Sequence, residues 1–402
     1  MKATHPRDKT ILFVNTFIPV APLYEAVFPR LVDKGLWPVA LLSQGEYRQS
    51  HKDTEMDFLA DYGDFVWIPP GLRSHKRWCN ILYWLLAPLK LIRTRSQAIV
   101  FLTQPPFFFV LGATIARLRK IPYAVQVMDL WPDALVELDY LRKDGLAHRL
   151  LLKWVTKAYN HARCVISVGR CMRDRLISQG VKPDKITVFY HWPRVEIHPV
   201  EREDNQFLKQ EGLYEKFIIL YSGNMGYGYS FDSILEAAKR LREYQDIVFM
   251  FVGRGPRRKE IEQAIASGQG NVALSDFVPQ DFIAHSLSAA DIHFLSLRPG
   301  FEGAIVPGKF YATLASKRPI LYEVMATAEG ARIIEEFNCG MVITPGDADS
   351  LTAHILHFYN DRKALANTGD HTEKALEYLA QPDLSPDAYV ETLLRVMMSK
   401  HS

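Results

Sequence analysis

The chain has 402 residues, 48% of them hydrophobic and 23% charged, with a formal net charge of +3, a balance typical of globular proteins that fold in water. Its length predicts two domains, and no apolar run approaches the roughly 20 residues that a membrane-spanning helix needs. The four cysteines form no CxxC pair and the N-terminus holds no apolar core of signal-peptide length, so the sequence indicates reduced thiols in a cytosolic protein rather than a disulfide framework or a zinc site.

Short apolar runs in the first half of the chain predict buried β-strands at residues 10–14, 37–42, 65–68, 98–102, 123–127, 164–168 and 186–189. Predicted helices separate most of these strands, at residues 23–34, 76–93, 107–119, 146–161 and 170–178. Strand and helix alternate, which favours a parallel sheet covered by helices on both faces.

The predicted helix at residues 76–93 lies in a basic stretch. Between Asp64 and Asp129 there is no acidic residue but there are nine Lys/Arg. A basic amphipathic segment with tryptophans fits the surface of an anionic membrane, although a helix packed on its own sheet with a solvated basic edge is the alternative. Nucleic acid is disfavoured because no nucleic-acid motif accompanies the charge. The residues predicted to dock on a membrane are Arg73, Lys76, Arg77, Trp78, Trp84, Lys90, Arg93 and Arg95.

A polar, proline-marked stretch predicts a linker at residues 196–215, between an N-terminal domain of residues 1–195 and a C-terminal domain of residues 216–380. The alternation then restarts, with strands at residues 217–221, 247–252, 272–274, 291–296, 319–322 and 341–343, a helix at 230–244 and a last helix at 386–398. The fold class is therefore α/β, with two doubly wound domains and a cleft between them, and ligands of such sheets bind at the carboxyl ends of the strands.

The connection after the strand at 291–296 combines Glu302, Gly303 and Gly308 with a predicted helix that begins at Lys309. Glycines let backbone approach a ligand closely, and a helix start offers free amides to anions. A carboxylate for hydroxyl groups and a cation for phosphates together suit a sugar diphosphate.

A second glycine turn, LYSGNMGYGYSFD at residues 220–232, places Gly223, Asn224 and Gly226 between a strand and a helix. A third, FVGRGPRR at residues 251–258, contains Arg254. Such loops bring backbone amides to phosphates, but ordinary strand-to-helix turns also favour glycine, and Arg254 faces either a phosphate or water.

Asp129 and Asp133 follow a predicted strand in VQVMDLWPDAL and are candidates for a catalytic pair, although Asp133 also suits a helix start. The pair Asp347 and Asp349 has the spacing of a metal-binding DxD, but it precedes an apolar helix and is better explained as a helix-start signature. The histidines show no metal-ligand spacing, so no metal is expected.

Taken together, these motifs resemble the retaining GT-B glycosyltransferases of family four, and within that family the transferases that build bacterial surface polysaccharides such as capsule, O-antigen and exopolysaccharide. The resemblance covers nearly the whole chain. The residues that carry it are DLWPDA at 129–134, YSGNMG at 221–226, FVGRGP at 251–256, ADIHFLSLRPGFEG at 290–303 and VPGKFYATLASKRPIL at 306–321.

The resemblance implies two Rossmann-like domains facing each other across a cleft, the second of which holds a nucleoside diphosphate sugar. It also implies that residues 381–402 return to the N-terminal domain as a helix. Glu302 matches the first glutamate of the family's E-x7-E motif, which holds sugar hydroxyls, and Gly223 and Asn224 match the start of the phosphate-side loop. The expected donor-binding residues are Gly223, Asn224, Gly226, Arg254, Arg298, Gly303 and Gly308.

The chain also departs from the family pattern. The second glutamate of E-x7-E is expected near residues 310–312, where no acid occurs, and the usual basic residues of the first C-domain loop are replaced by Asn224 and by Gly228 or Tyr229. Lys309 and Arg254 are the candidates to supply the missing positive charge.

The resemblance implies a metal-independent, cofactor-free transferase that acts on a lipid-linked glycan at the inner face of the cell membrane, with Asp129, Glu302 and Lys309 as catalytic residues. Two alternatives stay open. A nucleotide-sugar epimerase on the same fold would convert donor alone, without an acceptor. A catalytically reduced partner of another transferase would bind no nucleoside diphosphate.

Overall fold

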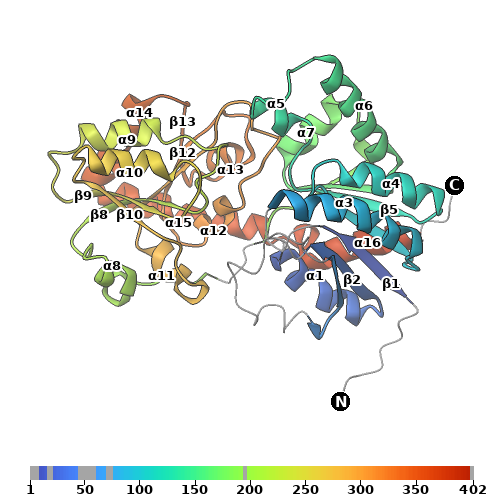
Figure 1. The fold of residues 1–402 in the computed structure, drawn as a ribbon. Helices are drawn as coiled ribbons and strands as arrows, with labels where there is room; N and C mark the ends of the chain where they lie inside the picture. The colour runs from blue at the N-terminus through green and yellow to red at the C-terminus, as the bar shows by residue number, and fades with distance from the viewer. Residues whose placement is uncertain (1–8, 16–20, 44–59, 69–75, 193–196, 399–402) are drawn as a thin grey trace. The chain divides into compact units, whose positions relative to one another are not determined.

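The computed structural model describes residues 9–15, 21–43, 60–68, 76–192 and 197–398. The chain divides into two compact units, the first made of residues 1–192 with 381–402 and the second of residues 193–380. Each unit is built on one parallel sheet with helices against it (Figure 1).

The sheet of the first unit has the strand order β3-β2-β1-β4-β5-β6-β7. Every pairing is parallel, and in the centre Leu12 lies opposite Val39 on one side and Ile99 on the other. The strands are β1 (Thr10–Val14), β2 (Trp37–Ser43), β3 (Asp64–Ile68), β4 (Ala98–Leu102), β5 (Tyr123–Val127), β6 (Cys164–Ser167) and β7 (Ile186–Val188). Because the order reverses at β1 and β4, the carboxyl ends of these two strands flank the switch point of a doubly wound sheet.

Right-handed crossovers place the helices of the first unit on both faces of its sheet. The elements are α1 (Ala21–Asp33), α3 (Lys76–Arg93), α4 (Phe108–Leu118), α5 (Asp133–Glu137), α6 (Leu146–His161), α7 (Arg170–Ser178) and the 3-10 turn η2 (Pro183–Lys185). Helix α4 packs between α3 and α6 on one face, whereas α1 covers the other (Figure 1).

The last helix of the chain, α16 (Pro386–Met398), packs beside α1 in the first unit. Tyr389 is fully buried there, and its ring lies 5.2 Å from that of Phe189 and 5.6 Å from that of Trp192. The Trp192 indole N–H donates to the carbonyl of Leu384, in the 3-10 turn η5 (Pro382–Leu384) that precedes the helix. The end of the chain thus completes the hydrophobic core of its beginning.

The second unit has a six-stranded parallel sheet in the order β10-β9-β8-β11-β12-β13. Its strands are β8 (Phe217–Ser222), β9 (Ile247–Val252), β10 (Val272–Ser275), β11 (Ile292–Ser296), β12 (Ile320–Glu323) and β13 (Gly340–Ile343). Its helices are α8 (Gln206–Gln210), α9 (Asp232–Arg240), α10 (Arg258–Ala266), α11 (Ile283–Ser288), α12 (Lys309–Leu314), α13 (Glu329–Phe337), α14 (Ala348–Asn360) and α15 (Arg362–Leu379), with 3-10 turns at Arg202–Asp204 (η3) and Gln280–Phe282 (η4). Alternate residues of β8 enter two cores, one on each face of the sheet.

The predicted linker needs a correction, because helix α8 lies inside it. Asn205 caps this helix by accepting a hydrogen bond from the Leu208 amide (3.1 Å). Phe207 and Leu208 are buried in the core of the second unit, so helix α8 is part of that unit. The polar composition of the surrounding residues concealed this single apolar turn.

None of the helices within the described ranges is both long and apolar enough to cross a lipid bilayer. The described residues likewise contain no cluster of three or more His, Cys, Asp or Glu side chains in metal-binding geometry. Cys164, Cys171 and Cys339 are buried free thiols. His293 lies in the core of β11, its Nε2 2.8 Å from the Ser316 hydroxyl, and burial lowers its pKa to about 3.

Candidate active site

The carboxyl ends of β8 and β9 meet in a glycine turn. Gly223 follows β8 with a φ of 132° and Gly253 follows β9 with a φ of 139°, a backbone region that side chains disfavour. A Cβ on Gly253 would lie 2.1 Å from the carbonyl oxygen of Gly223, so the two segments approach this closely only because Gly253 has no side chain. Bare backbone therefore lies at the edge of the sheet where doubly wound folds bind ligands.

Lys309, the first residue of α12, reaches this turn. A Cβ on Gly223 would lie 3.3 Å from Lys309 Cε. The ammonium donates hydrogen bonds to the Tyr221 hydroxyl and to the Asn224 carbonyl (3.1 Å). It lies 4.2 Å from the ring centroid of Tyr221 and 3.8 Å from that of Tyr229, within the range of cation–π attraction. The structure therefore brings Gly223, Asn224 and Lys309 together, and adds two tyrosines to them.

No carboxylate among the described residues pairs with the Lys309 ammonium, whose partners are a phenol, a carbonyl and two aromatic rings. Burial lowers the pKa of Lys309 well below its ordinary value, because the charged form loses its hydration. Burial also raises the pKa of Tyr221 well above its ordinary value, so this phenol is neutral. An anion that reaches the turn would favour the charged form of this lysine, which no acidic side chain in the described ranges stabilises.

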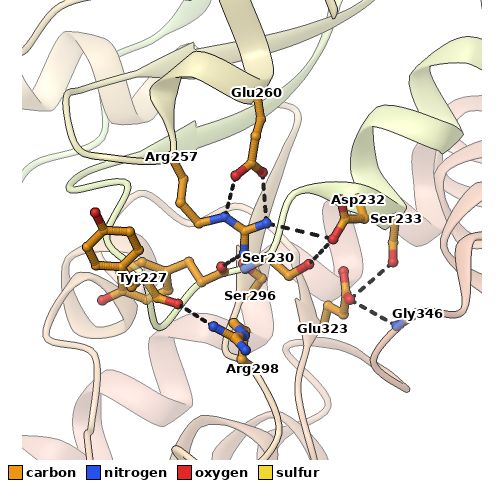
Figure 2. A network of polar contacts seen from close by, with 11 residues as sticks. Tyr227, Ser230, Asp232, Ser233, Arg257, Glu260, Ser296, Arg298, Glu323 and Gly346 are labelled. Atoms are coloured by element: carbon orange, nitrogen blue, oxygen red, sulfur yellow. Dashed lines mark hydrogen bonds and ion pairs between the residues drawn. The ribbon is translucent and has the colours of Figure 1, made fainter. Parts of the chain in front are cut away.

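Figure 2 shows the polar contacts that hold the loop carrying Tyr229. Arg257 donates to the Tyr229 carbonyl and forms two further hydrogen bonds, of 2.6 and 2.8 Å, to the carboxylate of Glu260. The amide of the next residue, Ser230, donates to the hydroxyl of Ser296 at the end of β11 (3.1 Å). Both sides of Tyr229 are thus tied to the framework, which fixes its ring beside the ammonium.

Two predicted donor-binding arginines have protein partners. Arg298 donates to the Tyr227 carbonyl (3.1 Å, Figure 2), and its amide donates to the Gly228 carbonyl (2.9 Å). Arg254 is exposed and lies 2.7 Å from the carboxylate of Asp276, which lowers the pKa of that carboxyl group. Arg298 therefore supports the same loop, and a donor contact by either arginine stays a prediction.

The connection between β11 and α12 holds the other predicted donor residues. Glu302 is half-buried and forms a backbone bridge with Ile305, and Gly303 has a φ of 75°. Gly308 is exposed and precedes α12, which begins at Lys309 as predicted and has six residues. A Cβ on Gly226, in the first loop, would lie 3.2 Å from the amide nitrogen of the neighbouring asparagine. The roles of these residues in binding stay predictions.

The network in Figure 2 also contains an acid that the sequence analysis did not single out, Glu323 at the end of β12. One carboxylate oxygen accepts hydrogen bonds from the Ser233 hydroxyl (3.1 Å) and the Gly346 amide (3.0 Å). The other oxygen is buried and has no hydrogen-bond partner among the described residues, and burial raises the pKa of this carboxyl group. Glu323 therefore links the starts of two helical segments at the carboxyl edge of the sheet.

Asp129 lies in the first unit, two residues after β5. The Thr103 hydroxyl accepts from the Asp129 amide (3.2 Å) and donates to its carbonyl (2.9 Å), which ties the turn to the end of β4. The Gln104 side-chain amide donates to the Asp129 carboxylate (3.1 Å). Burial raises the pKa of Asp129, and this single hydrogen bond offsets the effect only in part. The geometry gives the fold a carboxyl group poised to accept or share a proton.

Asp133, the other member of the predicted pair, has a structural environment. Its carboxylate accepts hydrogen bonds of 2.7 Å from Arg175 and of 2.7 Å from Gln179. It is the first residue of α5 and ties this short helix to α7. Asp347 accepts from the Ser350 amide (2.9 Å) and caps α14, which confirms the predicted helix start.

The residues predicted to dock on a membrane fall on α3 and its flanks. Arg73 and the side chains of Lys76, Arg77 and Trp78 lie outside what the structure describes. The ring of Trp84 contacts that of Phe108 on α4 (5.3 Å) and remains partly exposed. Lys90, Arg93 and Arg95 are exposed.

Tyr221 and Tyr229 are the site residues that sequence reasoning missed. The available signal is that Tyr221 ends the predicted strand at 217–221, and Tyr229 directly precedes the predicted helix at 230–244. Their partner Lys309 is 88 residues further along than Tyr221, so no local pattern reveals the contact.

Comparisons with known proteins add the family. A model described as "Glycosyl transferase 4-like domain" matches residues 30–192, and one described as "Glycosyl transferases group 1" matches residues 216–361. The first model begins after β1 and covers the other strands of the first sheet, and the second model covers all six strands of the second sheet. Each unit of the chain therefore matches a glycosyltransferase domain model.

Two relatives of this chain are bacterial. WbjE of Pseudomonas aeruginosa, named a probable glycosyltransferase, is 27% identical over 262 residues, which are 65% of this chain and 63% of that protein. WcaI of Escherichia coli (strain K12), which carries the name of a colanic acid biosynthesis glycosyl transferase, is 25% identical over 248 residues, which are 60% of this chain and 61% of that protein. The matched stretches thus span less than two thirds of either relative.

Among solved structures, Anabaena Alr3699/HepE in complex with UDP-glucose superimposes with a TM-score of 0.71 at 14% identity, covering 97% of this chain and 100% of that one. At this identity the likeness speaks for the fold. The prediction of a GT-B fold built from two Rossmann-like domains is confirmed.

Proposed function

We propose that this protein moves a sugar from a nucleoside diphosphate sugar to a lipid-linked glycan in the synthesis of a cell-surface polysaccharide. The names of WbjE and WcaI support the reaction class, and the second name supports the polysaccharide. The UDP-glucose bound to the structural neighbour from Anabaena supports the donor class. The observation that carries the proposal is the Lys309 ammonium, which lies beside the Gly223 turn without a carboxylate partner in the described structure.

In this proposal Lys309 binds the diphosphate beside the Gly223 turn. The leaving group of the reaction is itself a diphosphate, so stabilising its developing charge is the main electrostatic task. A cation enclosed by aromatic rings and backbone needs little reorganisation at the moment of reaction. Glu302 orients the donor sugar through its hydroxyl groups, and correct orientation is itself a large part of such rate enhancements.

Asp129 faces the reacting sugar or the acceptor from the first domain. The donor phosphate accepts the acceptor proton, and the product keeps the anomeric configuration of the donor, as the resemblance to the retaining family implies. We further propose that turnover needs no added divalent cation, because a lysine supplies the positive charge. Turnover that persists in a chelator and an anomeric assignment of the product by NMR test these two points.

The cellular site follows from the acceptor. A lipid-linked glycan lies at a membrane, and the basic helix α3 with Lys90, Arg93 and Arg95 suits an anionic one. We therefore place the protein in the cytoplasm, on the inner face of the cell membrane. Reduced vesicle binding at high salt is the expected behaviour of such an attachment.

The deciding experiment is calorimetric titration of UDP and UDP-glucose into the protein and into Lys309→Met. The parent is expected to bind at least one of them, and the variant at least about tenfold more weakly, because a charge-assisted contact to phosphate is lost. Lys259→Met is the matched control, since Lys259 is an exposed lysine of the same unit on α10. Equal affinities in all three proteins contradict the role of Lys309.

If the parent binds no nucleoside diphosphate at all, the catalytically reduced partner becomes the better hypothesis. Incubation of donor alone, followed by analysis of the sugar, tests the epimerase alternative. The proposed transferase leaves the configuration of the unreacted donor sugar unchanged.

A further inference from the structure

The first unit contains a second acid-free stretch, besides the one around α3. Between Asp144 and Asp174 there is no acidic residue, and the stretch encodes α6. In the structure α6 packs beside α4, and α4 packs beside α3 (Figure 1). None of the three helices contains an Asp or a Glu. Two stretches separated in sequence thus form one basic helical layer on one face of the sheet.

Helix α6 exposes an apolar stripe on the outside of this layer. Leu146 is 86% exposed, Leu150 44% and Trp154 51%. Their spacing of four residues places them on one face of the helix. Leu118, at the end of the neighbouring α4, is 81% exposed. Single exposed apolar side chains are ordinary, but an aligned group that includes a tryptophan indicates a binding surface.

Cations flank the stripe on the same helix. Arg149, Lys153 and Lys157 are exposed, and none of them forms an ion pair with any residue that the structure describes. Their positive charge is therefore available to an external partner. An apolar stripe with a tryptophan and flanking lysines is the pattern of a helix that lies in the interface of an anionic bilayer.

We propose that α6 is a membrane-binding surface that places Leu146, Leu150 and Trp154 at the headgroup boundary of an anionic bilayer, while Arg149, Lys153 and Lys157 contact lipid phosphates. The inference rests on the membrane-linked acceptor proposed above, and it adds α6 to the membrane-binding surface proposed there for α3. Charge complementarity selects the occupant, because a second copy of this chain would bring equally basic helices against α6.

The test is cosedimentation of the full chain with vesicles of phosphatidylcholine alone or with about 30 mol% phosphatidylglycerol, a fraction that gives a clearly negative surface. Binding is expected only to the anionic vesicles. The variant Leu146→Ser/Leu150→Ser/Trp154→Ser is expected to bind them at least about tenfold more weakly, since it removes three apolar groups from the interface. Lys153→Glu/Lys157→Glu is expected to lose at least about fivefold per residue.

Matched controls lie on α10 of the second unit. Ile265→Ser removes an apolar side chain with 39% exposure, close to that of Leu150, and Lys259→Glu reverses an exposed charge. Both are expected to leave vesicle binding within about twofold, because they lie outside the basic helical layer. UDP binding, measured without vesicles, verifies that each variant is folded.

Three results overturn the proposal. The α6 variants bind anionic vesicles as well as the parent does, or the parent binds neutral and anionic vesicles equally. Alternatively, light scattering shows a dimer that the serine variant abolishes, which makes α6 an interface between copies. If the parent binds anionic vesicles but does not bind UDP, the result counts against the proposed transferase function and leaves the proposal for α6 standing.

Discussion

The segment after β5 in the first unit holds two aspartates with different surroundings, and the glycine turns after β8 and β9 in the second unit are approached by two cations with different surroundings. Asp133 forms an ion pair with Arg175, and Arg254 forms an ion pair with Asp276. The Asp129 carboxylate instead accepts a hydrogen bond from the side-chain amide of Gln104. The Lys309 ammonium donates hydrogen bonds to a phenol and a backbone carbonyl.

The contrast separates charges that stabilise the fold from charges that are available for chemistry. Burial raises the pKa of Asp129 and lowers that of Lys309, so both groups are shifted toward their neutral forms. Each shift reflects desolvation that the fold does not offset with an opposite charge. A ligand that supplies the missing charge or hydrogen bond recovers this free energy, which is why such groups concentrate at functional sites.

The largest effect is expected for Asp133, the aspartate after β5 that forms an ion pair. Asp133→Ala leaves the partly buried Arg175 without its principal carboxylate, and breaking a buried ion pair in this way typically costs about 3 kcal/mol or more. We expect the unfolding free energy, measured by urea denaturation, to fall by about that amount. A loss below about 1 kcal/mol would show that the ion pair of Asp133 contributes little to stability, and Asp133 would then not differ from Asp129 in the way proposed.

Asp129→Asn is expected to behave in the opposite way. The amide oxygen still accepts from Gln104, so the fold is retained, while turnover falls at least about tenfold because the carboxylate is lost. Since the folded pKa of Asp129 is raised, the parent's stability declines as pH rises from the unfolded pKa through the folded one. The variant should lack this decline and be at least as stable at neutral pH. Denaturation curves at several pH values, with a steady-state assay, measure both quantities.

The pH dependence of UDP binding tests Lys309, the cation of the second unit that has no carboxylate partner among the described residues. Because the pKa of free Lys309 is lowered, the fraction of charged lysine decreases as pH rises through that value, and UDP affinity should fall several-fold. Binding should take up a proton, which calorimetry in buffers of different ionisation enthalpy detects. Lys309→Arg keeps its charge throughout and should show neither effect. The same pH slope in the arginine variant would assign the titration to another group.

The smallest effect is expected at the paired cation. Arg254→Ala removes an exposed side chain whose partner is Asp276, and we expect UDP affinity to change by less than about threefold. A loss of UDP affinity as large as that of Lys309→Met would indicate that Arg254 also binds the donor. The comparison between paired and unpaired cations would then no longer identify functional residues.

Most strands and the longer helices were predictable because each is a short apolar run or a periodic segment bounded by turn residues. Strand β4 and helices α3 and α6 have the predicted bounds. Helix α8 was not predictable, since one turn with two buried residues leaves almost no periodic signal. The sequence also identified Lys309 and Arg254 as cations near glycine turns. It offered no means of telling them apart, because Asp276 and Tyr221 are distant in sequence and only the fold brings them into contact.

The packing of α16 has a consequence for the order in which the protein is made. The first unit combines segments from either side of the second unit in the sequence, because Tyr389 belongs to the core that includes Phe13 and Phe189. The second unit is complete when residue 380 has emerged, whereas the first still lacks one helix. During synthesis part of the apolar surface of the first unit therefore stays uncovered until α16 has been made and can pack on it.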